Sequence, residues 1–230
     1  MALLSAWILR ANLDDIRVEP RSPLDNVGPF KLQNDLATLR LMSTEDALQI
    51  LKWRTSDRSR FLHEGAKTVD DQIRWMSSRP GNELNFIIEC SCGCPIGMIS
   101  LVDINPDKAV AEPARFIVEK AFSSGGFAVS ASSLLYELAF ENLQIEALVG
   151  HVAEQNVGMV RWHESFGMEV TGFSESAENI RGLGTKMVSI RLTRQRYRTI
   201  TVPRMNAYLQ LIRKKTNDSR CPCSSATSNR

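Results

Sequence analysis

Apolar and polar residues follow two different periods along the chain. The run LATLRLM (residues 36–42) alternates as a half-buried strand does, and residues 47–54 then show apolar positions at helical spacing after a helix-start signature at residues 43–46. A second helix begins with the same signature at Thr68 and is ended by the turn residues at 80–82. The first part of the pattern therefore predicts one strand followed by two helices.

Three β-rich runs come next and are joined by short connections. They are LNFIIEC, PIGMISLVDI and AVAEPARFIVE, and the connections CSCGC and NPDK are short enough to predict consecutive antiparallel strands. The remaining expected elements are a helix over 128–140, a strand over 145–155, a helix over 156–166, strands over 168–173 and 184–192, and a C-terminal helix marked by Met205, Tyr208, Leu209 and Ile212. This order predicts an α/β fold with a mixed, mostly antiparallel sheet flanked by helices.

A pair of glycines lies directly before the helix expected at 128–140. Gly125 and Gly126 belong to the stretch EKAFSSGGFAVSAS, residues 119–132. The first backbone N–H groups of a helix have no intrahelical partners and attract an anion, and glycine lets a ligand approach the backbone. A glycine pair is equally typical of an ordinary turn, so alone it leaves both interpretations open.

Composition describes an ordinary globular protein. Of the 230 residues, 43% are apolar and 23% are charged, which allows one sizeable domain or two small ones. The opening MALLSAWILR lacks a basic start and soon reaches Asp14 and Asp15, unlike a secretory signal. No stretch approaches the roughly 18 apolar residues of a membrane span. We expect a cytoplasmic protein without a membrane partner.

The cysteines predict a reducing compartment and no metal site. There are five, an odd number, and three of them crowd together as Cys90, Cys92 and Cys94, while Cys221 and Cys223 form a second group. Structural zinc sites prefer two to four residues between paired cysteines, and here only one intervenes. A tight turn between two strands is the simpler interpretation of the first group.

Charge is unevenly distributed along the chain. Residues 191–230 contain ten Lys or Arg and one acid, a net charge of +9, whereas the whole chain carries +2 and residues 1–190 therefore carry −7. A basic tail can contact nucleic acid, but its end, DSRCPCSSATSNR, is typical of disorder, and Tyr197 and Tyr208 are its only aromatic residues. We do not expect nucleic acid as a partner. The acidic body weakly favours a cationic substrate.

Three segments together resemble the GNAT superfamily of N-acetyltransferases. Ser123-x-x-Gly126-x-Ala128 is similar to the acetyl-coenzyme A signature Q/R-x-x-G-x-G/A at a helix start. Residues 156–168, NVGMVRWHESFGM, resemble the family segment N-x-x-A-x-x-L-Y-x-K-L-G-F, and LRLMSTEDALQILKWR (39–54) resembles the opening of the branch with ribosomal-protein N-terminal and spermidine acetyltransferases. The chain departs from the family at Ser123, which replaces Gln or Arg, and at Met159, His163 and Met168.

The resemblance implies an acetyl-coenzyme A dependent enzyme with splayed central strands. It would transfer acetyl to a primary amine by direct attack in a ternary complex, and the amine would belong to a small molecule or a peptide. A protein N-terminus, a polyamine and a nucleotide-linked amino sugar all remain open as acceptors, and so does a homodimer. We expect an N-terminal extension at 1–34, where three of the nine prolines fall, the domain at 35–195, and a basic C-terminal helix and tail at 196–230.

The same resemblance assigns site residues by position. In the family, the strand before the glycine loop pairs with the pantetheine arm and the loop N–H groups hold the pyrophosphate. The implied cofactor-binding residues are Phe116, Ile117, Val118, Ser124, Gly125, Gly126, Phe127, Ala128 and Asn156. The expected acceptor site contains Trp53, Arg54, Phe61, His63, Glu64 and Trp75, of which Trp75 is the most open to a purely core role.

Three residues are candidates for proton transfer. Glu112 lies on the strand before the loop and Glu154 follows the next strand, so either carboxylate is a candidate base for the amine. His163 stands where the family commonly has Tyr and is a candidate acid for the departing thiolate. The altered signature also leaves two alternatives: a non-catalytic coenzyme A binding module, and a nucleic-acid or ribosome-associated protein that uses the basic tail.

Overall fold

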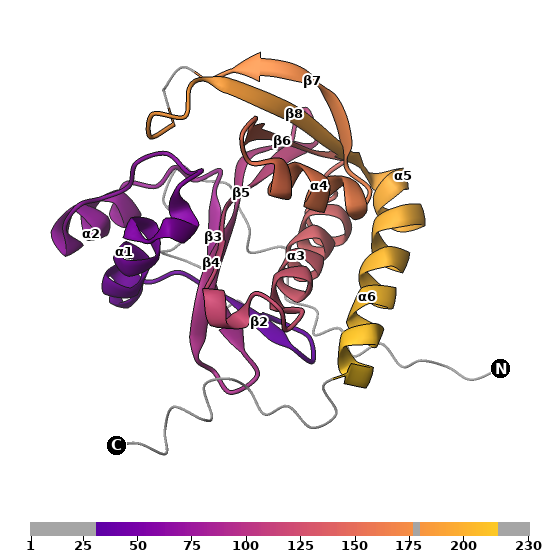
Figure 1. The fold of residues 1–230 in the computed structure, drawn as a ribbon, viewed down its shortest axis with the longest axis horizontal. Helices are drawn as coiled ribbons and strands as arrows, with labels where there is room; N and C mark the ends of the chain where they lie inside the picture. The colour runs from indigo at the N-terminus through magenta and orange to yellow at the C-terminus, as the bar shows by residue number, and fades with distance from the viewer. Residues whose placement is uncertain (1–30, 177–179, 216–230) are drawn as a thin grey trace.

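The computed structural model describes residues 31–176 and 180–215, and Figure 1 shows a central sheet with helices on both sides. The eight strands lie in the order β1-β2-β3-β4-β5-β6-β8-β7. Every neighbouring pair is antiparallel except β5 and β6, which are parallel. Their bounds are β1 Lys31–Gln33, β2 Ala37–Leu41, β3 Leu84–Cys90, β4 Pro95–Asn105, β5 Val110–Val118, β6 Ala147–Ala153, β7 Glu169–Glu175 and β8 Lys186–Thr193.

The helices form two layers. The α-helices are α1 Ala47–Thr55, α2 Val69–Ser77, α3 Phe127–Glu137, α4 Val157–Ser165, α5 Arg194–Arg196 and α6 Val202–Lys215. Single tight turns of 3₁₀-helix are η2 Thr44–Asp46, η3 Asp57–Ser59 and η4 Lys120–Phe122, and wider π-turns are η5 Leu138–Asn142 and η6 Tyr197–Thr201. α1 and α2 cover one face of the sheet, and α3 and α6 cover the other (Figure 1).

Burial on both faces explains the continuous apolar runs of the central strands. In β3, Ile87 packs toward α1 and α2, whereas its neighbours Phe86 and Ile88 belong to the core on the α3 side. All three side chains are fully buried. The sequence LNFIIEC therefore lacks the apolar–polar alternation of a half-exposed strand because each of its faces meets a helical layer.

The two central strands part soon after they meet. β5 and β6 pair only at Val110 with Ala147 and at Ala111 with Leu148. From Glu112 onward the facing edge of β5 pairs with no strand among the residues that the structure describes. This confirms the expected splayed central strands and opens the sheet at its middle.

A β-bulge re-aims β5 just beyond this point. Met98 pairs with Ile117 and Ser100 with Ala114, so two residues of β5, Arg115 and Phe116, face the single residue between them on β4. Arg115 has a φ of 52°, a left-handed conformation that a non-glycine residue adopts rarely. Bulges of this kind often lie beside functional sites, where they turn the backbone of one strand.

The structure confirms the expected elements and adds others at both ends. β1 pairs with β2, so the sheet begins at Lys31, inside the segment expected as an extension. β1 was missed because it has three residues and one apolar side chain, Leu32. α6 packs on α3 through buried Met205 and Leu209, so the C-terminal helix is part of the domain core. The residues after 215 lie outside the described part.

Basic side chains near the C-terminus are paired with acids of the body. Four arginines form such ion pairs: Arg194 with Glu146, Arg196 with Glu169, Arg198 with Glu141, and Arg213 with Asp35. Part of the positive charge of the C-terminal segment is therefore neutralised by acids of the body within the fold. Among the described residues, no helix is both long enough and apolar enough to span a membrane.

The cysteine-rich segment is the tight turn between β3 and β4 that its spacing predicts. The Gly93 N–H donates to the Cys90 carbonyl at 2.9 Å, and Gly93 has a φ of 81°. The sulfur atoms of Cys90, Cys92 and Cys94 lie within 4.8 Å of one another.

Candidate active site

A cavity of about 1030 Å³ lies where the sheet opens. Its walls come from the two helical layers and from the parted strands, and they include the β5 segment 112–118, the β6 segment 151–153 and α4. One end, which we call the acceptor end, is formed by α1, α2 and the segment 60–66. The other end reaches Ser123 and Ala128, on either side of the glycine pair.

Glu112 and His151 face each other across the opening. Glu112 Oε2 lies 3.7 Å from His151 Nδ1, and the His151 backbone N–H donates to Glu112 Oε1 at 3.4 Å. Burial raises the pKa of Glu112, although the nearby His151 acts in the opposite direction. A carboxylate with a raised pKa is a stronger proton acceptor, and the half-exposed imidazole connects it with solvent.

The glycine pair precedes α3 as the sequence predicts. Gly126 is the N-cap residue, with a φ of 81°, and an added Cβ would meet Ile212 of α6 and Leu36 at 3.4 Å each. A Cβ on Gly125 would lie 2.5 Å from the ring of Phe127. Both positions thus need glycine, one for its backbone conformation and one for the ring packed against it.

Five of the nine expected cofactor-binding residues line the cavity. They are Phe116, Ile117, Val118, Ala128 and Asn156. Ser124, Gly125, Gly126 and Phe127 are not among the lining residues, and the Phe127 side chain is buried against Phe122. Anion binding by these four therefore stays a prediction about their backbone N–H groups alone.

His163 lines the cavity but does not suit the role expected of it. It is 9% exposed, and among the described residues its Nδ1 has no hydrogen-bond partner. Burial lowers the pKa of His163 from 6.5 to about 4, so the ring is neutral at pH 7. A neutral imidazole carries no extra proton for a thiolate, and the general-acid assignment made from sequence needs correction on this physical ground.

Two further sequence assignments are corrected by burial and exposure. Glu154 is exposed on the turn after β6 and is not among the residues that line the cavity. Trp53 is 4% exposed, and its indole Nε1 donates to Glu119 Oε1 at 2.7 Å inside the α1–α2 core. Trp53 is therefore a core residue, and Glu154 lies outside the cavity lining.

The other expected acceptor residues do line the cavity. They are Arg54, Phe61, His63, Glu64 and Trp75. Trp75 was the one most open to a core role, yet its ring borders the cavity, with Arg79 at 4.3 Å and Arg115 at 5.2 Å from its centroid. Trp75 therefore remains a candidate for the acceptor site, whereas Trp53, which was expected there as well, lies in the core.

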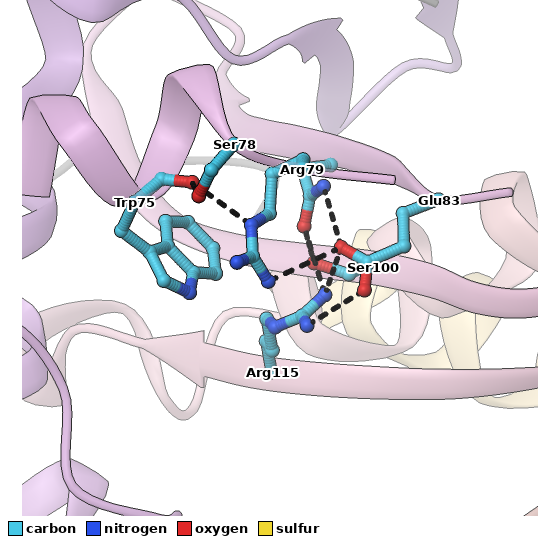
Figure 2. A network of polar contacts seen from close by, with 7 residues as sticks. Trp75, Ser78, Arg79, Glu83, Ser100 and Arg115 are labelled. Carbon is cyan, nitrogen blue, oxygen red and sulfur yellow. Dashed lines mark hydrogen bonds and ion pairs between the residues drawn. The ribbon is translucent and has the colours of Figure 1, made fainter. Parts of the chain in front are cut away.

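Behind Trp75, a polar network holds the bulged segment of β5 (Figure 2). The Arg115 guanidinium donates to both carboxylate oxygens of Glu83, at 3.0 and 3.1 Å, and to Asn85 Oδ1 at 3.2 Å. Ser100 donates to the same Asn85 oxygen at 2.7 Å. These hydrogen bonds hold the side chain of Arg115, the bulge residue, and so help to maintain its left-handed backbone conformation.

Several lining residues were missed from sequence. These are Arg58, Gln72, Ser132, Tyr136, His151 and Trp162. A polar residue within the apolar run ALVGHVA was a signal for His151, but its partner depends on the register of β5 and β6. Arg58 was hidden in a polar loop. Its Nε donates to the Val118 carbonyl at 3.0 Å, which places a cation beside the start of the glycine loop.

A mixed sheet that opens beside a glycine-led helix is the architecture of the GNAT acetyltransferases. The family model of the GNAT acetyltransferase domain matches residues 37–169. The match spans more than half of the chain, and the protein belongs to this family of acetyltransferases.

Solved structures show the same fold at low sequence identity. A GCN5-related N-acetyltransferase from Brucella melitensis is 16% identical, with a TM-score of 0.68 over 80% of this chain and 86% of that one. An engineered variant of the spermidine N-acetyltransferase SpeG from Vibrio cholerae is 21% identical, with a TM-score of 0.62 over 72% of this chain and 98% of that one. No curated protein matches in a sequence comparison.

Proposed function

We propose that the protein is an acetyl-coenzyme A dependent N-acetyltransferase in which Glu112 accepts the proton of an attacking amine. The Glu112–His151 pair, set in the cavity between β5 and β6, is the observation that supports this proposal most directly. A lysine-like amine has a pKa near 10.4, so only about one molecule in a thousand is free base at neutral pH. A base within the cavity removes that limit.

The residues present fit coenzyme A. The cavity lining includes both the residues that flank the glycine pair and those of the acceptor end, and the edge of β5 that faces away from β4 offers backbone groups at Phe116, Ile117 and Val118. The N–H groups of residues 124–128 and the side chain of Arg58 would hold the phosphates. When bound, acetyl-coenzyme A supplies the acetyl group as a thioester, whose C–S bond breaks as the amine nitrogen forms the amide.

Different residues around the opening accept the amine proton and stabilise the negative charge on the carbonyl oxygen. Glu112 takes the amine proton, and His151 passes it toward solvent because its ring is half exposed. Backbone N–H groups at the Arg115–Phe116 bulge stabilise the negative charge that develops on the carbonyl oxygen. The coenzyme thiol that acetyl transfer would release has a pKa of about 8.5, so water would suffice as its proton source and no acidic side chain would be required.

Direct attack in a ternary complex is favoured over an acetylated enzyme. No cysteine is among the described residues that line the cavity, so the described lining offers no thiol to carry the acetyl group. The experiment follows thiol release from acetyl-coenzyme A with a panel of amines and identifies products by mass spectrometry. Intersecting initial-velocity patterns support the proposal, and an acetylated protein that forms without amine would contradict direct attack.

Two other functions give different outcomes in the same experiments. A non-catalytic module would bind coenzyme A but release no thiol with any amine. The Glu112–His151 pair favours the catalytic alternative, because a binding module needs no base. A nucleic-acid partner is disfavoured by the ion pairs of Arg194, Arg196 and Arg198. Binding of RNA that weakens with salt and is lost on truncation after Arg194 would support that alternative.

A further inference from the structure

The acceptor end of the cavity contains a buried donor without a partner. Gln72, on α2, is 2% exposed and lines the cavity. Among the described residues, its amide nitrogen Nε2 has no hydrogen-bond partner. Buried polar groups are nearly always paired, so an N–H donor that remains unpaired beside a cavity calls for an acceptor atom from a ligand.

Arg54 places a cationic donor group at the same end. Its Nη2 donates to the His63 carbonyl at 2.6 Å, but none of the described carboxylates forms an ion pair with it. Burial, and then the charges of Arg181 and Arg115, lower the pKa of Arg54 to about 10. Arg181 is held close, because its Nη2 donates to the Arg54 carbonyl at 3.0 Å. The guanidinium of Arg54 therefore lies in a locally positive field.

The neighbouring Arg115 differs from Arg54 because it is paired with a carboxylate. Both carboxylate oxygens of Glu83, which also lies 3.9 Å from Arg79, accept from Arg115, so Arg115 has the acidic partner that Arg54 lacks among the described residues (Figure 2). Of the acids that line the cavity, Asp57, Glu64 and Glu175 are exposed and screened by solvent. Among the lining acids that the structure describes, Glu112 alone is largely shielded from water, with 23% of its side chain exposed, and it lies at the opening of the sheet, where the amine would bind.

The cavity is thus bipolar, with a carboxylate at the opening and donors at the acceptor end. We infer that the acceptor is a small amine that also carries an anionic group, a carboxylate or a phosphate, whose oxygens are bound by Arg54 and Gln72. This inference rests on the proposed acetyltransferase function. A polyamine fits poorly, because it offers only N–H donors and positive charges to Arg54 and Gln72.

The test compares matched amines that differ in one anionic group. Glucosamine 6-phosphate is paired with glucosamine, an α-amino acid with its amide, and spermidine is included as the polycation. A charge-assisted contact gives the anionic member of a pair a kcat/KM about tenfold to a hundredfold higher. The two pairs also distinguish the phosphate source from the carboxylate source.

Two variants connect the preference to these side chains. Arg54→Gln and Gln72→Leu each lower the ratio of kcat/KM between anionic and neutral amines toward one, mainly through KM. Gln72→Leu removes an unpaired donor, so we expect this variant to fold normally. It keeps the test decisive if Arg54→Gln fails to fold. Arg74→Gln, on the exposed side of α2, removes a charge outside the cavity lining and should leave the ratio unchanged.

The outcomes separate this inference from the function on which it rests. If thiol is released but spermidine or the neutral amines are preferred, the acceptor assignment is wrong and the acetyltransferase function stands. An unchanged ratio in both Arg54→Gln and Gln72→Leu overturns it as well. If no amine releases thiol, the proposed function itself fails.

Discussion

Glu112 Oε2 and His151 Nδ1 lie 3.7 Å apart across the point where β5 and β6 stop pairing. The two residues come from strands that meet at only two positions, so their approach is set by the short parallel register of the sheet. A base placed there has access to the cavity on one side and to solvent through His151 on the other.

Replacing Glu112 by Gln should lower kcat about a hundredfold, the usual scale of a general base. The wild-type rate should rise with pH through the raised pKa of Glu112, and this acidic limb should disappear in the variant. Glu154→Gln is the matched control, since Glu154 is exposed and outside the cavity lining. Equal turnover in Glu112→Gln and wild type would exclude Glu112 as the base.

The same substitution should not destabilise the fold. Burial raises the pKa of Glu112, so the folded state binds its proton more tightly than the unfolded state does. Stability from this group therefore falls as pH rises through that pKa, and at pH 7 the ionised carboxylate is unfavourable. The urea midpoint of Glu112→Gln at pH 7 should equal or exceed that of wild type.

His163 should make the protein sensitive to mild acid. Its pKa is 6.5 when unfolded and about 4 when folded, so the contribution is complete above pH 6.5 and is lost as pH falls toward 4. Between pH 7 and pH 5, wild type should lose about 2 kcal/mol more unfolding free energy than His163→Leu. Urea unfolding at both values measures this, and equal losses in the two proteins would contradict the buried neutral state of His163.

The elements of the fold were predictable, whereas several partners were not. Periodicity reports which residues share a face, and it found every strand from β2 onward and the four longer helices before α5. It cannot report which neighbour that face meets. Both Trp53 and Trp75 lie on apolar faces of short helices, and only the packing of α1 on the sheet decides that Trp53 is core. His151 was missed because its partner depends on a register between distant strands.

The Glu83–Arg115 pair should contribute much more to stability than a surface pair. The side chains are 8% and 21% exposed, so loss of the carboxylate leaves a largely buried cation without its partner. Glu83→Ala should cost about 3 kcal/mol of unfolding free energy. Glu141→Ala breaks the exposed pair with Arg198 and should cost much less, because solvent screens that pair. Similar urea midpoints for these two variants would show that the network in Figure 2 is energetically unimportant.

Alanine substitutions at two glycines should change stability in opposite directions. Gly126 has a φ of 81°, and Gly126→Ala should cost about 1–2 kcal/mol, because left-handed backbone strains an L-residue. Gly158 lies in the first turn of α4, and an added Cβ would meet no atom within 4 Å. Gly158→Ala should therefore stabilise the protein by about 0.5–1 kcal/mol. Thermal or urea unfolding distinguishes the two, and a stabilised Gly126→Ala would rule out the left-handed N-cap.

Ser123 stands where the family signature has Gln or Arg, and Arg58 offers a cation close to the same loop. The Ser123 hydroxyl is exposed and donates to the Lys120 carbonyl at 2.7 Å, while the Arg58 Nε donates to the Val118 carbonyl at 3.0 Å. We expect Arg58 to supply the side-chain charge that the loop lacks. Arg58→Gln should weaken acetyl-coenzyme A binding about tenfold, the scale of one exposed charge-assisted contact.

Restoring an arginine in the loop should reverse that loss. Ser123→Arg should tighten acetyl-coenzyme A binding about tenfold in the Arg58→Gln background, and the gain should shrink as salt is raised. Calorimetric titration measures both affinities. Acetyl-pantetheine, which lacks the pyrophosphate, is the control ligand and should bind equally to all variants. If Ser123→Arg tightens acetyl-pantetheine as well, or fails to tighten the full cofactor, the phosphates are not bound at this loop.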